Sequence, residues 1–120
     1  MAITEFLHAA ILVSDLQKSE RFYSQILGLK MVDRPLKFPG IWYQVGGFQI
    51  HLIRASDVIG DRVNEEKWGR NRHLAFSVSD LKEYQKILTE NHCQFQMSAS
   101  GRSALFTEDP DGNIIELNQQ

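Results

Sequence analysis

The nine residues His8-Ala-Ala-Ile-Leu-Val-Ser-Asp-Leu16 decide the fold, because the chain contains this stretch twice. It returns as His73-Leu-Ala-Phe-Ser-Val-Ser-Asp-Leu81, with six of nine positions identical and an offset of 65 residues. The same offset carries Ile50-His51-Leu52 onto Ile115-Glu116-Leu117. A recurrence that keeps one offset at both ends of a segment, with no net gap, indicates an internal duplication.

The first copy predicts a βαβββ module. Ser14 and Asp15 are N-cap residue types, apolar residues at helical spacing follow them, and Gly28 is suited to end the helix. Alternation and turn residues predict the strands, which we expect at 6–13, 29–34, 41–45 and 48–53, with a Gly46-Gly47 hairpin between the last two.

The second copy repeats this plan. Asp80 and Glu83 have the spacing of a capping box, Asn91 is a candidate left-handed stop, and 109–112 reads as a turn. Strands are expected at 73–78, 93–97, 103–107 and 113–118. The sequence therefore predicts one α+β domain over 1–120, with module one at about 6–53, a link at 54–72 and module two at about 73–118. The link is favoured as a plain connection; the alternative is a lid whose arginines reach an anionic substrate.

Length, charge and cysteine content exclude several classes of protein. A chain of 120 residues is one domain by length, and a net charge of −2 gives no attraction to nucleic acid or anionic membranes. No run of eighteen apolar residues and no signal-peptide pattern are present, so we expect no membrane span. Cys93 is the single cysteine, which predicts a reducing, cytoplasmic location.

The duplication places four metal-competent side chains at two equivalent positions, namely His8, His51, His73 and Glu116. Strand alternation puts each of them on a face whose other residues are partly small or polar, as a concave site requires. Imidazoles and a carboxylate suit Zn, Ni, Co, Fe(II) or Mn better than Ca or Mg. Three histidines and one glutamate would leave a divalent site with a charge of about +1, which favours substrates that become anionic.

Each of these residues also has a simpler interpretation. A single strand histidine is usually structural, and Glu116 could face solvent. His92 lies outside the repeat register and is expected at the surface, whereas Trp42, Tyr43 and Phe106 are expected in the core or in a pocket wall. The shared register of the four residues is what favours a common site.

Four motifs carry a resemblance to a known family: HAAILVSDLQKSERFYSQILGL, QIHLI, RHLAFSVSDL and FTEDPDGNIIELNQ. In their order and spacing the chain resembles the vicinal oxygen chelate superfamily, which includes glyoxalase I, methylmalonyl-CoA epimerase, extradiol dioxygenases, and fosfomycin and bleomycin resistance proteins. The resemblance implies two βαβββ modules, each curling an open sheet around half of a metal cup. It also implies a homodimer, because in short members one site commonly takes ligands from both chains.

The resemblance also implies roles for the four residues. His8 and His73 match the first-strand metal ligands, and Glu116 matches the last-strand glutamate. His51 matches the fourth position, where similar glyoxalase I proteins usually carry a glutamate. Glyoxalase I chemistry uses a metal-bound carboxylate as base, so Glu116 is the candidate catalytic residue.

Three functions stay open at this point. The first is a glyoxalase I-like lyase or isomerase that acts on a small oxygen-chelating substrate and uses Glu116 for proton transfer. The second is an iron(II) extradiol-type dioxygenase, or a thiol or fosfomycin-type transferase, using His8, His73 and Glu116. The third is a non-enzymatic, bleomycin-resistance-like binding protein. Four intact ligands favour an enzyme, and the first function is preferred.

Overall fold

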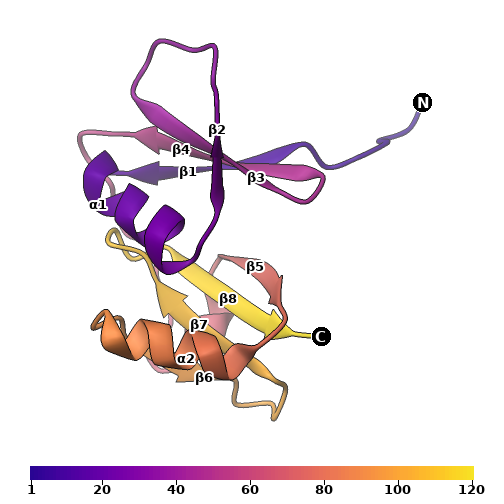
Figure 1. Cartoon of the computed structure of the whole chain (residues 1–120), viewed down its shortest axis with the longest axis vertical. Helices are drawn as coiled ribbons and strands as arrows, with labels where there is room; N and C mark the ends of the chain where they lie inside the picture. Colours follow the sequence, from indigo (N-terminus) through magenta and orange to yellow (C-terminus); the bar gives the residue numbers. More distant parts are fainter. The chain divides into compact units, whose positions relative to one another are not determined.

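A computed structural model describes all 120 residues of the chain. The chain divides into two compact units, Met1–Val58 and Ile59–Gln120, and each contains one four-stranded sheet and one main helix (Figure 1). The predicted α+β class and the two βαβββ modules are confirmed. None of the helices has the length and apolar character needed to cross a membrane.

Module one forms a mixed sheet with the strand order β1-β4-β3-β2, in which β1 and β4 are parallel and the other pairs antiparallel. The helix of the module begins as α-helix and continues as a π-helical segment. Its elements are β1 (His8–Val13), α1 (Leu16–Glu20), η1 (Arg21–Ile26), β2 (Lys30–Val32), β3 (Gly40–Val45) and β4 (Phe48–Arg54).

Module two repeats this arrangement with the strand order β5-β8-β7-β6, and β5 and β8 are its parallel pair. A short 3-10 helix precedes the repeated part. The elements are η2 (Trp68–Arg70), β5 (His73–Val78), α2 (Leu81–Glu90), β6 (Phe95–Met97), β7 (Ala104–Glu108) and β8 (Ile114–Gln119).

The ends of the two helices show which helix signals in the sequence were correct. Asp15 and Asp80 are the N-caps, and each side chain accepts a hydrogen bond from the backbone N–H three residues later. Gly28 has a φ of 81°, as a C-terminal glycine should. The prediction for Asn91 is wrong: its φ is −100°, and His92 is the left-handed residue with a φ of 59°. The Asn91 amide instead donates to the Ile87 carbonyl at 2.8 Å and so caps the last helical turn.

A one-residue difference separates the middles of the two modules. Asp15 and Asp80 are 65 residues apart, whereas the helix-ending residues Gly28 and His92 are 64 apart. The extra residue in the first helix is accommodated by the π-helical segment, where Leu27 N–H donates to the carbonyl five residues earlier at 2.9 Å. The in-register duplication therefore holds at the ends of the modules but not in β2 and β3.

The hairpin turns restore the register. The Gly46-Gly47 turn has two residues, whereas the second hairpin closes with three residues between Asp109 and Asn113, whose backbones bond at 2.9 Å. Gly112 in that turn has a φ of 85°. The insertion in the helix and the shorter first turn cancel, so the sequence offset returns to 65 in the last strand of each module.

Half of the predicted link is a structural part of module two. Trp68 is buried, and the buried Asn71 amide bonds four backbone groups of the segment 63–68. Arg62 pairs with Glu108 and lies over the Trp68 ring, at 4.9 Å from its centroid. The interpretation as a plain connection is therefore wrong for this half, and Arg62 is held by these contacts.

Candidate metal centre

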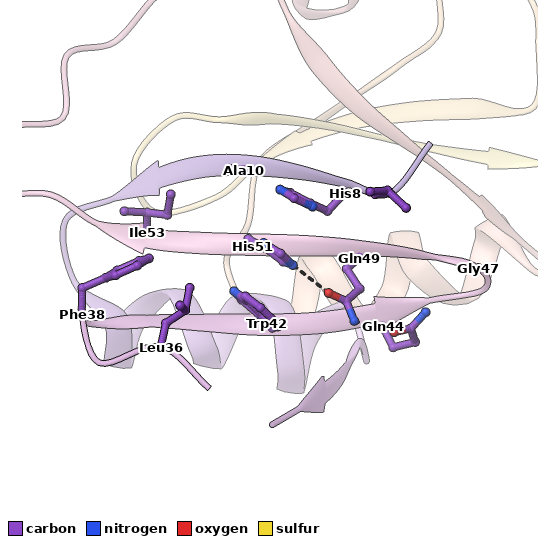
Figure 2. Close-up of a pocket in the computed structure, with 11 residues that line it drawn as sticks. His8, Ala10, Leu36, Phe38, Trp42, Gln44, Gly47, Gln49, His51 and Ile53 are labelled. Carbon is purple, nitrogen blue, oxygen red and sulfur yellow. Dashed lines mark hydrogen bonds between the residues drawn. The ribbon is translucent and has the colours of Figure 1, made fainter. Parts of the chain in front are cut away.

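The predicted site residues of module one lie side by side on the sheet. Ala10 pairs with His51 across β1 and β4, so His8, two residues before Ala10, shares the face of His51. The two imidazole rings stack with centroids 4.0 Å apart and planes 15° apart. The Trp42 ring covers the other side of His51, also at 4.0 Å and within 5° of parallel. Figure 2 shows the three rings in a row across the three strands.

The hydrogen bonds of His51 assign its tautomer. His51 Nε2 is 2.7 Å from Gln49 Oε1, and the Gln49 amide nitrogen donates in turn to Gln44 Oε1 at 2.9 Å. Because an amide oxygen only accepts, Nε2 carries the proton and Nδ1 keeps the lone pair. Burial lowers the pKa of His51, and the nearby His8 and Arg34 lower it further. His51 is therefore held as the neutral imidazole that metals require.

The stacked rings do not yet have the geometry of two metal ligands. A ring nitrogen coordinates through a lone pair in the plane of its ring. The His8 and His51 rings are nearly parallel with centroids 4.0 Å apart, so their lone pairs point past each other rather than at one point. The His8 side chain is exposed, so it is the one that can turn to make the pair convergent.

The pair in module two has a different arrangement. Ala75 pairs with Glu116 across β5 and β8, which puts His73 and Glu116 on one face. His73 Nε2 lies 3.2 Å from Glu116 Oε1. His73 Nδ1 lies 2.7 Å from the Asn71 carbonyl, so Nδ1 donates and Nε2 faces the carboxylate. A separation of 3.2 Å fits two adjacent ligands of one ion at about 2.0–2.2 Å each.

The remaining groups around Glu116 fix its orientation. The carboxylate is buried, and its Oε2 accepts a hydrogen bond from Asn118 Nδ2 at 3.0 Å. Arg102 Nη1 lies 3.7 Å from the same oxygen. The Phe106 and His73 rings lie nearly perpendicular to each other, with centroids 5.5 Å apart. These contacts leave Oε1 as the oxygen directed at His73. Residues that hydrogen-bond to metal ligands commonly orient them in this way.

The four predicted residues are therefore brought together as two pairs. His8 lies with His51 and His73 with Glu116, and neither module adds a third histidine, cysteine or carboxylate to its pair. That the two pairs complete one site stays a prediction. His92 is exposed at the end of α2, outside both pairs.

A pocket of about 560 Å³ opens over the first pair. Trp42, predicted to be in the core or a pocket wall, is one of its walls (Figure 2). The lining residues are Leu7, His8, Ala10, Leu36, Phe38, Trp42, Gln44, Gly47, Gln49, His51 and Ile53.

Sequence reasoning assigned no orienting role to the residues that hydrogen-bond the two pairs. Gln49 and Asn71 precede His51 and His73 by two positions, and Asn118 follows Glu116 by two. Strand alternation did place Gln49 on the face of His51 and Asn118 on the face of Glu116, because residues two apart share a face of a strand, but it does not show which of them bond the site residues. Asn71 lies before β5 and acts through its backbone carbonyl, which leaves no side-chain pattern to read.

Comparisons with known proteins agree with this architecture. A family model described as the glyoxalase/bleomycin resistance protein/dioxygenase superfamily matches residues 5–117. An Arabidopsis thaliana protein named glyoxylase I 4 is 27% identical over 96% of this chain and 70% of its own length. Lactoylglutathione lyase of Escherichia coli O157:H7 is 29% identical over 95% of this chain and 91% of its own length.

A solved structure agrees on the fold. The crystal structure of a glyoxalase family protein from Bacillus anthracis superposes with a TM-score of 0.79 at 20% identity, and covers 100% of this chain and 98% of that one. Because the family match extends over nearly the whole sequence, this chain belongs to the glyoxalase/bleomycin resistance protein/dioxygenase superfamily.

Proposed function

We propose that this protein is a metal-dependent lyase or isomerase of the glyoxalase I type, acting on a small substrate with two neighbouring oxygen atoms. The observation that carries the proposal is the pair in module two, where His73 Nε2 and the buried Glu116 carboxylate face each other at 3.2 Å. Relatives named as glyoxylase I and lactoylglutathione lyase support the reaction class.

His8, His51, His73 and Glu116 are the residues that would hold a divalent metal. Their imidazole and carboxylate donors fit Zn, Ni, Co, Fe(II) or Mn. The metal would supply Lewis-acid polarisation of the substrate oxygens. The hydrogen bonds already present agree with metal binding. His73 Nδ1–H donates a hydrogen bond to the Asn71 carbonyl, which leaves Nε2 available to coordinate a cation.

Glu116 is the residue we assign to proton transfer. His51 stands where similar glyoxalase I proteins usually carry a second glutamate, so Glu116 is the one carboxylate of the proposed ligand set. Asn118 donates to Oε2 and leaves Oε1 directed toward the ligand side. A base in this position would take a proton from a substrate carbon and return it to the neighbouring carbon.

We also propose that the protein works as a homodimer in the cytoplasm, with each site taking His8 and His51 from one chain and His73 and Glu116 from the other. Each module supplies two ligands, which is half of the proposed set. Mixing His8→Ala with Glu116→Ala chains tests this arrangement, because subunit exchange should restore a fraction of intact sites. A monomer that binds metal with full affinity would contradict it.

Elemental analysis after reconstitution tests the metal site itself. We expect one ion per chain in the wild type, and loss of most of it in His73→Ala and Glu116→Ala. His92→Asn is the matched control, because it removes a histidine outside both pairs and asparagine tolerates the left-handed conformation there. Metal content that is unchanged in both alanine variants would refute the site.

An iron(II) dioxygenase is the second candidate, and the state of His51 favours it. His51 is sandwiched between two rings, and without it His8, His73 and Glu116 form a two-histidine, one-carboxylate set. Oxygen uptake with a catechol, dependent on iron(II), would select this function. Turnover of the hemithioacetal of methylglyoxal with other divalent metals would select the first.

A further inference from the structure

Arg34 lies on the same face of module one as the histidine pair. Val32 pairs with Trp42, so Arg34, two residues further on, is opposite Gly40, and Gly40 pairs with Ile53. A Cβ on Gly40 would lie 3.2 Å from Arg34 Nη2. The guanidinium therefore occupies the space that a side chain at position 40 would fill, next to the wall of the pocket.

Arg34 is half-buried, and its guanidinium has few partners for a cation in that position. Its Cζ lies 4.8 Å from the centroid of the Phe38 ring, and Nη1 makes a long 3.5 Å contact with the Leu36 carbonyl. Nε and Nη2 are both buried and have no hydrogen-bond partner. An unpaired buried donor of a charged group costs free energy of folding. The fold thus keeps a cation whose hydrogen bonds are unsatisfied.

The two unpaired nitrogens are the pair that binds carboxylates. The Nε–H and the outer Nη2–H of an arginine project in parallel from one edge of the planar group, at the spacing of the two oxygens of a carboxylate. We propose that Arg34 anchors the carboxylate of a small organic acid, whose apolar body lies against Phe38 and Trp42 in the pocket. This inference deepens the proposed function, on which it rests, by naming the substrate class.

The segment over the guanidinium can give access to it. Residues 33–39 connect β2 to β3 and belong to neither strand. The Phe38 ring lies next to the guanidinium, yet Phe38 is 46% exposed and Leu36 of the same segment is 44% exposed. Moving this part of the segment costs little buried apolar area, so a ligand carboxylate can displace Phe38 from the guanidinium.

The test uses metal-free wild-type protein and two compounds of the same shape, phenylacetate and its neutral amide phenylacetamide. Calorimetric titration should show the acid binding roughly 10-fold or more tightly than the amide, since hydrogen bonds to a charged group are worth about 1.5–3 kcal/mol. Arg34→Met should abolish this preference. Lys37→Met is the matched control, because it removes the same charge from the same segment, and it should keep the preference.

Several outcomes would overturn the inference. They are equal binding of acid and amide to the wild type, no binding of either at millimolar concentration, and a preference that survives in Arg34→Met. Should Arg34→Met fail to fold, the NMR signal of the Arg34 Nε–H in the wild type decides: phenylacetate must shift it and phenylacetamide must not. Because no metal is added, failure here is distinct from failure of the metal site.

Discussion

The histidine pair of module one and the histidine–glutamate pair of module two occupy equivalent strand positions but are held in different states. His73 and Glu116 face each other through donor atoms 3.2 Å apart. His8 and His51 lie face to face as stacked rings, which is not a ligand geometry. The duplicated backbone thus determines where four side chains lie, and the neighbours of each pair determine whether they are ready for a metal.

Those neighbours differ at each corresponding position. Trp42 of β3 pairs with His51 and stacks flat on it, whereas Phe106 of β7 pairs with Glu116 and lies nearly perpendicular to the His73 ring. The orienting amide also changes place, from Gln49 before His51 to Asn118 after Glu116. Module two therefore has the half of the proposed site whose donor atoms already face each other, and module one the half that must rearrange.

Replacing the carboxylate of module two should have the largest effect. If Glu116 moves the proton, Glu116→Gln should lower kcat by roughly 10²–10⁴-fold. Steady-state kinetics on the hemithioacetal of methylglyoxal, with metal content measured in parallel, give the value. Glu90→Gln on the exposed surface of α2 is the control and should leave kcat unchanged. A metal-loaded Glu116→Gln enzyme with near wild-type kcat would remove the assigned base.

The residues two positions before the two histidines, Gln49 and Asn71, should show the next largest difference. Asn71→Ala leaves two backbone N–H groups, of Val63 and Asn64, without their acceptor, so unfolding free energy should fall by about 2–4 kcal/mol. Gln49→Ala removes one half-buried acceptor of His51, and should cost about 1 kcal/mol. Urea unfolding of the metal-free variants measures both. Equal losses would mean that the two residues stabilise their modules equally, contrary to the comparison.

The duplicated nonapeptide explains why the fold could be predicted. His8 to Leu16 and His73 to Leu81 contain a strand and an N-cap in one stretch, and Asp15 and Asp80 do cap helices as expected. The extra residue of the π-helical segment was hidden, because the shorter Gly46-Gly47 turn compensates for it and leaves the offset unchanged. A local pattern cannot report an insertion that a distant turn cancels.

The candidate site could be predicted less completely than the fold. Strand alternation assigned each of the four residues to one face of its own strand, because period-two spacing decides which face a side chain occupies. The strand register of the structure then places His8 on the face of His51 and His73 on the face of Glu116. It could not show that one pair stacks and the other does not, since that depends on the rotamers of neighbours such as Trp42. The unpaired nitrogens of the Arg34 guanidinium could not be predicted from the sequence either, because their burial depends on how the segment 33–39 folds.

The smallest expected effect concerns the protonation of module one in the absence of metal. Burial lowers the pKa of folded His51 below the value of about 6.5 that a histidine has in the unfolded chain. As the pH falls below about 6.5 the unfolded state takes up this proton first, so stability is lost progressively until the folded pKa is passed. Above about pH 6.5 both states are neutral at this residue and the effect is absent.

Urea unfolding of metal-free protein at pH 7.5 and 5.5 measures this loss. His51→Phe keeps an aromatic ring between Trp42 and His8 but cannot take up a proton, so its stability should fall less than that of the wild type over this interval. An identical fall in both proteins would show that His51 is as easily protonated in the folded chain as in the unfolded one. The fold would then not hold His51 neutral for a metal, and module one would differ from module two in geometry alone.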